Sequence, residues 1–254
     1  MPDEPELSIV MPAYNEAASL ETAIQQCENL MEQIGRPIEV IVVDDGSGDG
    51  SDLLLKTLSL ERTWLRVVSH ETNQGYGRAL RSGFAAARGK LIFYTDADNQ
   101  FDITELSEHL ALMAESDMLV GYRVYRYDPL PRLIVSWIYN RIVGALFRVR
   151  VRDVDCSFKI MRRSRLDAIV LLSDDFFIDT ELVARARKWN WRIREVGVRH
   201  YPRRTGKTSV RPGDIPRTLR VIALMWFRIH FPNRKRYANA LLDQANDREI
   251  LRGT

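Results

Sequence analysis

Two carboxylates and a neutral amide follow an apolar segment of this chain. Leu91–Thr95 is largely apolar and is followed by Asp96, Asp98 and Gln100. Carboxylates at positions i and i+2 of a turning backbone can point at one hard divalent cation, and an amide oxygen can add a third ligand. A diphosphate would complete the shell, and the cation would neutralise charge on a departing nucleoside diphosphate. The spacing predicts a metal site here, although isolated carboxylate pairs also occur in ordinary solvated loops.

Two further polar segments are suited to binding a nucleoside. They are Pro12-Ala13-Tyr14-Asn15-Glu16 and Asp44-Asp45-Gly46-Ser47-Gly48-Asp49-Gly50-Ser51, and each follows a short apolar run. The ring of Tyr14 offers a stacking face for a base, and the carboxylates of Glu16 and Asp45 can accept from a base or from ribose hydroxyls. The alternative is turn chemistry, in which Pro12 starts a turn, Asn15 caps a helix and Asp-Gly pairs form turns.

The spacing of apolar residues predicts the elements that position these segments. Leu7–Met11 and Glu39–Val43 have the apolar, β-branched character of buried strands, and the helical spacing between them predicts a helix that stops at Gly35. The alternation continues with strands at 65–68, 91–95 and 118–120 and with helices at 78–87 and 105–114. Such alternation indicates an α/β fold with a mostly parallel sheet. Ligands of these sheets collect at the carboxyl ends of the strands, where the polar segments lie.

Beyond Gly121 the pattern is looser. It predicts a strand at 156–161, a helix at 179–189 and a strand at 191–198, and arginines interrupt two apolar stretches at 130–149 and 217–231. We expect residues 1–210 to form one domain and residues 211–254 a basic, amphipathic C-terminal tail. Helices of this composition can lie in a membrane interface. The alternative is that they are core helices packed on the sheet.

Composition limits the partners of the chain. Its 254 residues carry a net charge of +3, but from Arg199 to Arg236 eleven Lys or Arg face one acid, Asp214. This suits phosphorylated substrates or a membrane surface, and the absence of zinc-finger cysteines and of an aromatic RNA-binding signature argues against nucleic acid. Cys27 and Cys156 are too few for a disulfide framework and fit a reducing cytoplasm. We expect no signal peptide, because the first six residues are acidic and lack an apolar run, and no transmembrane helix, because no uncharged run reaches about 20 residues.

The order of the motifs is more specific than any one of them. A further motif, Asn73-Gln74-Gly75-Tyr76-Gly77-Arg78-Ala79 with Gly83, lies between the Asp44–Ser51 segment and the Asp96–Gln100 segment, and its glycines would let a loop and a helix approach closely. No G-x-G-x-x-G follows the first strand, which argues against a dinucleotide-dependent dehydrogenase. With its motifs in this order the chain resembles family 2 glycosyltransferases. Over roughly residues 7–210 it is most similar to the dolichyl- and polyprenyl-phosphate sugar synthases.

This resemblance implies a Rossmann-like GT-A fold and a Mg²⁺ or Mn²⁺ ion. It also implies a nucleotide-sugar donor of the GDP-mannose or UDP-glucose type and a polyprenyl or dolichyl phosphate acceptor. The positions that match the nucleoside-binding residues are Pro12, Tyr14, Glu16, Val43 and Asp45, and those that match the donor-metal loop are Asp96, Ala97, Asp98 and Gln100. Gly121-Tyr122-Arg123 resembles the family's G-x-R, whose arginine meets phosphate, a role that suits a bidentate guanidinium.

Three later segments resemble the family with departures. Asp153–Lys159 is similar to D-x-x-x-G-F but has Ser157 in place of glycine, and Phe177–Leu182 is similar to an F-x-x-E helix start in which Asp179 can equally be an N-cap. Arg203–Ser209 is similar to a loop that closes over the donor, with Ser209 in place of lysine and Lys207 two positions earlier. We therefore expect Arg203 and Lys207 to contact the donor. The predicted catalytic residues are Asp98, Arg123 and Asp179.

The acceptor decides what chemistry these residues must supply. A lipid phosphate is already anionic, so its attack with inversion needs positioning and electrostatics rather than a strong base. A saccharide hydroxyl needs a carboxylate base, for which Asp179 and Asp155 are candidates. A nucleotide-binding module without catalysis is a third alternative, against which the intact Asp96, Asp98 and Arg123 argue. We expect an enzyme peripheral to the inner face of the cytoplasmic membrane, attached through 130–152 and 217–231; a membrane-protein partner is compatible with this location.

Overall fold

A seven-stranded sheet forms the centre of the protein. The computed structural model describes residues 5–125, 130–202, 215–231 and 234–253. The strand order is β3-β2-β1-β4-β6-β5-β7. The strands are β1 (Leu7–Ala13), β2 (Ile38–Asp44), β3 (Leu65–Ser69), β4 (Leu91–Tyr94), β5 (Met118–Arg123), β6 (Lys159–Arg162) and β7 (Ile193–Val198). All neighbours are parallel except β6, which is antiparallel to β4 and to β5.

The register of the central strands brings their polar loops to one edge. Pro12 of β1 pairs with Val43 of β2, and Val10 pairs with Tyr94 of β4. The chain therefore leaves β1, β2 and β4 on the same side of the sheet, as the carboxyl ends of parallel strands must. The predicted nucleoside and metal segments lie together for this reason.

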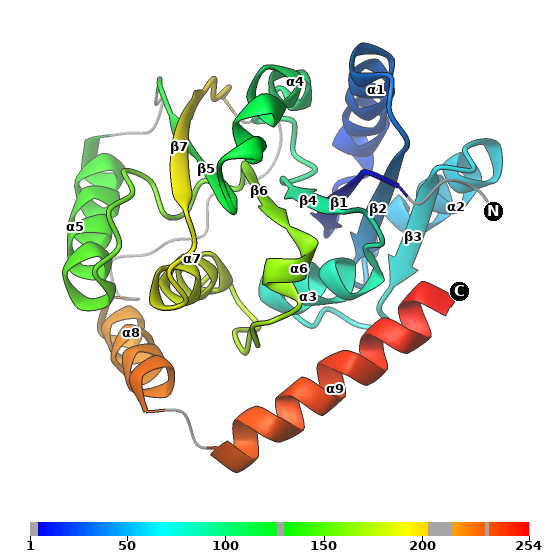
Figure 1. The fold of residues 1–254 in the computed structure, drawn as a ribbon. Helices are drawn as coiled ribbons and strands as arrows, with labels where there is room; N and C mark the ends of the chain where they lie inside the picture. The colour runs from blue at the N-terminus through cyan, green and yellow to red at the C-terminus, as the bar shows by residue number, and fades with distance from the viewer. Residues whose placement is uncertain (1–4, 126–129, 203–214, 232–233, 254) are drawn as a thin grey trace.

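Helices cover both faces of the sheet (Figure 1). One hydrophobic core lies under α1 (Ala17–Ile34) and α2 (Ser51–Glu61), and the other under α3 (Tyr76–Ala86) and α7 (Ile178–Lys188). The second face also carries α5 (Leu130–Phe147), α8 (Ile215–His230) and α9 (Arg234–Gly253). A short α6 (Arg163–Leu166) follows β6. Figure 1 shows α9 running from α8 across α3, so that the chain ends near β3.

The predicted end of the first helix is confirmed, whereas its predicted N-terminal cap was wrong. Gly35 ends α1 in the left-handed conformation (φ 61°), with its amide bonded to the Met31 carbonyl. Asn15, predicted as the helix cap, is not at the N-cap position, which Glu16 occupies without a side-chain cap. Asn15 instead has φ 56°, and its side chain accepts from the Gly48 amide. A partner in the neighbouring loop replaces the cap.

The helix α2 and the form of residues 103–114 were not predicted. Leu55 and Leu58 of α2 are buried whereas Leu53 and Leu60 are exposed, so its apolar residues encircle the helix and its amphipathic signal is weak. In place of one helix at 105–114, the structure has short successive turns: η1 (Ile103–Glu105), α4 (Leu106–His109) and η2 (Leu110–Ala114). The strand expected at 156–161 begins at Lys159.

The C-terminal segments return to the body of the protein. Arg66 of β3 donates to the Leu251 carbonyl over 2.6 Å, and Trp226 of α8 donates to the Leu146 carbonyl of α5 over 3.1 Å. Within the described part of the chain, none of the helices is both long and apolar enough to cross a bilayer. The predicted domain boundary at residue 210 lies outside the described residues, as do Arg203 and Lys207.

Candidate active site

The loops after β1 and β2 are joined by hydrogen bonds between side chains and backbone. The Asn15 amide donates to Ser47 Oγ over 2.9 Å, and the Ala17 amide donates to Asp49 Oδ2 over 3.0 Å. Glu16 accepts from the Ser19 hydroxyl over 2.9 Å. Tyr14, at the tip of the first loop, keeps half of its side chain exposed (50%), as a stacking platform for a base requires.

Asp45 orders the neighbouring loop from a buried position at the end of β2. Its carboxylate accepts from the amides of Gln74 and Gly75, each over 2.9 Å, and Oδ1 lies 2.6 Å from His70 Nδ1. These contacts bring the glycine motif against the first two loops. The contact of Asp45 with a nucleoside stays a prediction. In that contact the nucleoside would share the Asp45 carboxylate with the amides of Gln74 and Gly75.

The Asp96–Gln100 loop lies at the end of β4, beside the nucleoside loops. Asp96 Oδ2 accepts from the Ser157 hydroxyl over 2.7 Å, whereas the buried Oδ1 has no hydrogen-bond partner among the described residues. Burial raises the pKa of Asp96 and the nearby Asp179 carboxylate adds to the rise, whereas the Ser157 hydrogen bond, the Tyr76 hydroxyl and the Lys159 charge offset part of it. Asp98 accepts from the Gln100 amide over 3.1 Å, and the Gln100 side chain donates to the Tyr201 carbonyl over 3.2 Å.

The residues at this loop fit a divalent cation that a substrate also ligates. The uncompensated Asp96 oxygen and the nearby Asp98 carboxylate are hard ligands of the kind that Mg²⁺ and Mn²⁺ prefer. In the described ranges, no group of three or more His, Cys, Asp or Glu side chains is placed to hold a metal by itself. The site therefore suits an ion whose remaining ligands come from a diphosphate and water.

A buried lysine lies next to the metal loop. Lys159 is fully buried (0% exposed), donates to the Cys156 carbonyl over 2.5 Å, and pairs with Asp179. Asp179 also accepts from the Tyr94 hydroxyl. Phe177, not Asp179, is at the N-cap position of α7, so the alternative of Asp179 as an N-cap was wrong. The Asp179 carboxylate lies in the first turn of α7 and contacts Tyr94 and Lys159 instead.

Asp155 differs from Asp179 in having an uncompensated oxygen. Its buried Oδ1 has no hydrogen-bond partner among the described residues. Burial raises the pKa of Asp155 to about 7, with further increases from Asp179 and Asp153 and a partial offset from Lys159 and Arg123. A carboxyl group with a pKa near neutrality is suited to exchanging a proton, so Asp155 fits the general-base role better than Asp179.

Arg123 occupies the end of β5 and is paired within the protein. Its Nε and Nη2 atoms donate to the two carboxylate oxygens of Asp153 over 2.6 and 2.8 Å. Burial by itself would lower the pKa of Arg123, but the hydrogen bonds and charge of Asp153 outweigh it and raise this pKa. Contact of Arg123 with phosphate stays a prediction, and it requires an oxyanion to join or displace Asp153.

A groove of about 970 Å³ runs along α5 next to this site. Its apolar lining includes Leu133, Ile134, Trp137, Val149 and Val151, and its basic lining consists of Arg141, Arg150 and Arg152. On the inner side of α5, Asn140 accepts from the Val154 amide over 2.9 Å. The segment that forms one wall of the groove therefore leads directly to Asp153 and Asp155.

A sequence profile of the family described as Glycosyl transferase family 2 matches residues 8–170. The chain belongs to this family. The predicted family membership is confirmed, and the matched residues include the strands and loops that carry Tyr14, Asp45, Asp96 and Arg123. The family 2 profile ends before α7, so it does not cover Asp179.

Two curated relatives of this family 2 chain are named for polyprenyl-phosphate substrates. The chain is 34% identical over 221 residues to the dodecaprenyl-phosphate galacturonate synthase of Rhizobium johnstonii. The matched region covers 85% of this chain and 64% of the relative. The chain is also 34% identical over 167 residues to the undecaprenyl-phosphate 4-deoxy-4-formamido-L-arabinose transferase of Pseudomonas aeruginosa. This match covers 65% of this chain and 49% of the relative. The chain thus spans 49% to 64% of the length of these relatives.

The fold is similar to that of glucosyl-3-phosphoglycerate synthase from Mycobacterium tuberculosis, solved in complex with Mn²⁺, UDP and glucosyl-3-phosphoglycerate. The TM-score is 0.67 at 20% identity, over 89% of this chain and 80% of that chain. This similarity confirms the predicted GT-A fold with its mostly parallel sheet.

Several residues of the family 2 site were not predicted from the sequence. The contacts of Lys159 with Asp179, of Tyr94 with Asp179 and of Asp153 with Arg123 join distant parts of the chain. One signal was present for Lys159, a lysine within the otherwise apolar run from Phe158 to Met161, because a charge in a buried strand requires a partner.

Proposed function

We propose that this family 2 enzyme transfers a sugar, with inversion, from a nucleoside-diphosphate sugar to a polyprenyl phosphate. The donor side is supported by three loops that meet at the carboxyl ends of β1, β2 and β4. Tyr14 and Glu16 would meet the nucleoside; the exposure of the Tyr14 ring and the position of Asp45 at the base of the same loops support this assignment. Arg203 and Lys207 keep their predicted donor contacts as part of this proposal.

Asp96 and Asp98 would hold a Mg²⁺ or Mn²⁺ ion, with Gln100 as the predicted neutral ligand. The bound ion would neutralise charge that develops on the leaving diphosphate. The uncompensated oxygen of Asp96 and the Mn²⁺ bound in the mycobacterial complex support this assignment. The residues around the loop do the positioning, since Ser157 orients Asp96 by a 2.7 Å hydrogen bond.

The groove along α5 is the observation that carries the acceptor assignment. Its mixture of apolar side chains and arginines matches a molecule with a hydrocarbon chain and an anionic head. Both curated relatives are named for such a substrate, dodecaprenyl or undecaprenyl phosphate. The groove wall formed by Arg150, Val151 and Arg152 continues along the chain to Asp153, the partner of Arg123, and we assign the head group to this end of the groove.

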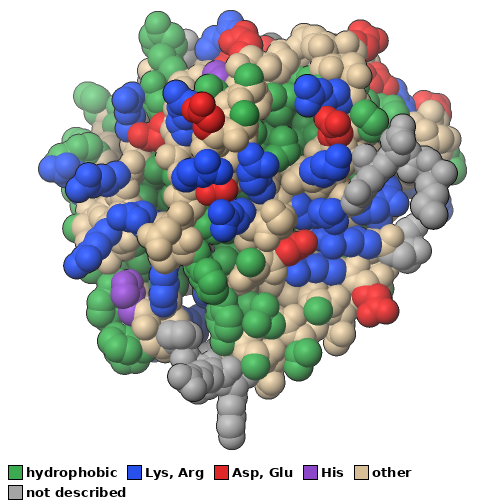
Figure 2. Space-filling view, in the orientation of Figure 1, with side chains coloured by type: hydrophobic (Ala, Val, Ile, Leu, Met, Phe, Trp, Pro, Cys, Tyr) green, Lys and Arg blue, Asp and Glu red, His purple; other side chains and the backbone are tan. Residues whose placement is uncertain are grey.

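The outer faces of α5 and α8 support attachment to a membrane that contains this acceptor. Trp137 is 63% exposed on α5 and Phe227 is 61% exposed on α8, and both helices carry other exposed apolar residues. In Figure 2, hydrophobic side chains mix with Lys and Arg at the edge where α5 and α8 lie in Figure 1. Helices of this kind can lie in the interface. We place the enzyme at the inner face of the cytoplasmic membrane, where a membrane-protein partner stays a prediction.

A phosphate acceptor needs no general base, because its oxygen is already anionic. A saccharide hydroxyl is the second candidate acceptor, and one observation favours it: the pKa of Asp155 is raised to about 7, which suits a base. The two candidates differ in the expected effect of Asp155→Asn. Turnover would fall steeply with a hydroxyl acceptor and little with a phosphate acceptor.

The test is sugar transfer by the purified protein into vesicles. Labelled UDP- and GDP-sugars are supplied with Mg²⁺ or Mn²⁺ to vesicles that contain undecaprenyl phosphate, and the label in the lipid extract is measured. We expect transfer from one donor that EDTA abolishes. Vesicles that contain undecaprenol, which lacks the phosphate, are the control. Transfer to a soluble saccharide with none to the lipid phosphate would overturn the proposed acceptor.

A further inference from the structure

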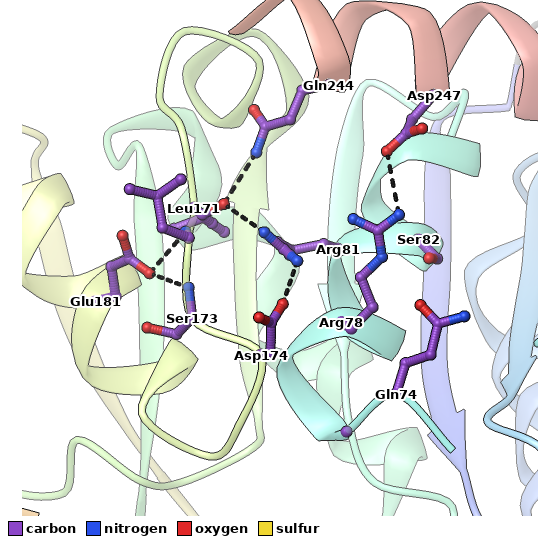
Figure 3. A network of polar contacts seen from close by, with 12 residues as sticks. Gln74, Arg78, Arg81, Ser82, Leu171, Ser173, Asp174, Glu181, Gln244 and Asp247 are labelled. Carbon is purple, nitrogen blue, oxygen red and sulfur yellow. Dashed lines mark hydrogen bonds and ion pairs between the residues drawn. The ribbon is translucent and has the colours of Figure 1, made fainter. Parts of the chain in front are cut away.

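Arg81 of α3 grips the loop at 171–175 from one side (Figure 3). Its Nη1 atom donates to the Leu171 carbonyl over 3.1 Å, and its Nη2 atom pairs with the Asp174 carboxylate. The side chain is only 17% exposed. Burial lowers the pKa of Arg81, and the Asp174 charge counteracts this. The partly desolvated guanidinium of Arg81 thus bonds to both ends of one loop, to Leu171 through Nη1 and to Asp174 through Nη2.

Two other helices hold the same loop from different directions. Glu181 of α7 accepts from the amides of Leu172 and Ser173 over 2.9 and 2.8 Å. Gln244 of α9 donates to the Leu171 carbonyl over 3.2 Å. Figure 3 shows these side chains converging on the loop from separate elements. Because the loop contains no strand or helix, side chains set its position.

The loop in turn supports the start of α3. The Gly77 amide donates to the Asp174 carbonyl over 3.0 Å. A Cβ atom at Gly77 would lie 2.5 Å from the Ser173 carbonyl oxygen, and one at Gly75 would lie 2.4 Å from the Asp174 carbonyl oxygen. Both glycines are required by this close approach. On its other side, the Gly75 amide bonds to Asp45. The glycine motif therefore lies between the nucleoside loop and the 171–175 loop.

The same loop leads directly into α7, whose first turn carries Asp179. Asp175 accepts from the Phe177 amide over 3.1 Å, and α7 begins at Ile178. Asp179, one residue later, contacts Tyr94 and Lys159 beside the metal loop. A displacement of the 171–175 loop would thus be transmitted to both the donor side and the Asp179 side of the site.

We propose that Arg81 is a positioning residue that couples the nucleoside loop to Asp179 through the 171–175 loop. This inference rests on the proposed function for its kinetic readout. Arginine is suited to the task because its planar fork can bind the Leu171 carbonyl and the Asp174 carboxylate together, which a lysine ammonium cannot do with the same geometry. The loops after β1 and β2 are also held to one another by Ser47 and Asp49, so we expect loss of Arg81 to change the donor side less than the Asp179 side.

The test compares Arg81→Met with Arg78→Met as a matched control. Arg78 lies one turn earlier on α3, and its guanidinium pairs only loosely with Asp247, at 3.7 Å between partly exposed side chains. We expect Arg81→Met to lower kcat by about 10- to 100-fold with the donor KM nearly unchanged, because misplacement of a site by about 1 Å has this effect. Arg81→Lys should recover part of kcat, and Arg78→Met should match the wild type.

Hydrogen exchange separates this inference from the proposed function. Amides of residues 171–179 should exchange faster in Arg81→Met than in Arg78→Met, and this readout needs no sugar transfer. If the wild type transfers sugar to no lipid phosphate, the proposed function fails while the exchange result still decides the role of Arg81. Should Arg81→Met not fold, Asp174→Asn weakens the same grip and keeps the Leu171 bond. Equal kcat and equal exchange in the Arg81 and Arg78 variants would overturn the inference.

Discussion

The donor side and the α5–α8 side of this enzyme differ in how their surface side chains are paired. Polar groups on the donor side bond within the protein, whereas large apolar side chains on α5 and α8 are exposed. Around β1 and β2, polar loop residues bond to backbone amides of the neighbouring loop, as Asn15 and Asp49 do. On α5 and α8, large apolar side chains such as Trp137 and Phe227 face outward. The first arrangement is complete within the protein, as the preorganised nucleoside site that we propose requires. The second leaves apolar area whose burial against another apolar phase would be favourable.

The buried charged groups of the site differ from one another in a similar way. Asp96 and Asp155 each keep a buried oxygen without a hydrogen-bond partner among the described residues, whereas Arg123 is fully paired with Asp153. Uncompensated buried oxygens are costly and are kept where a ligand or a proton satisfies them. Under the proposed function, a cation would satisfy the Asp96 oxygen and a proton the Asp155 oxygen, whereas Asp153 already holds Arg123 in place.

The largest expected effect is on the metal loop of the donor side. Asp96→Asn and Asp98→Asn should each lower turnover by about 100-fold or more, because each removes a charge that the diphosphate-bound cation needs. Initial rates with saturating Mn²⁺ measure this, and Asp52→Asn, at an exposed site in the first turn of α2, is the control. Full activity in both loop variants, or in EDTA, would contradict the metal assignment.

The next effect concerns the pair of Arg123 with Asp153. Arg123→Met removes the guanidinium that bonds to both oxygens of the buried Asp153 carboxylate, which should lower the free energy of unfolding by about 3–5 kcal/mol. Urea denaturation measures this change. In the double variant Arg123→Met/Asp153→Leu we expect most of the stability to return while turnover stays low, because the phosphate contact is still missing. Recovery of turnover in the double variant would make Arg123 a purely structural residue.

A smaller effect is expected at the exposed apolar surface. The double variant Trp137→Ser/Phe227→Ser should weaken binding to anionic vesicles by about tenfold, because aromatic side chains that leave the interface lose their burial energy. Vesicle flotation measures the bound fraction, and higher salt should lower it in the wild type as arginines are screened. Leu60→Ser, which removes an exposed leucine (82%) from α2 on the opposite face, is the control. Equal flotation of all three proteins would remove α5 and α8 from the contact.

The last effect is a pH dependence of stability from Asp155. Its pKa is raised from 3.8 to about 7 in the folded protein. The native state therefore keeps a proton that the unfolded state releases, so this residue's contribution lowers the free energy of unfolding as pH rises from about 4 to about 7. Asp155→Asn should remove this part of the dependence. Urea midpoints of both proteins across that range test it, and parallel curves would contradict the raised pKa.

The sequence by itself determined the donor half of this protein. The strands β1, β2 and β4 are marked by short-range patterns, an apolar run followed by polar turn residues, and parallel pairing then brings their carboxyl ends together. The order of these motifs also indicated the family before any contact was known. Local errors remained where a tertiary partner replaced a local one, as at Asn15, which bonds to the Gly48 amide instead of capping α1.

Only the tertiary structure decided the catalytic interior and the outer face. Lys159 and Asp179 meet because β6 inserts antiparallel between β4 and β5, a pairing that no local pattern specifies. Arg123 and Asp153 are 30 residues apart, so their ion pair has no sequence signature. The apolar residues of α5 were visible in the sequence, but helical periodicity cannot tell a face buried in the core from one left exposed, because both are equally apolar. Packing against α7 and α8 fixed which side of α5 faces outward.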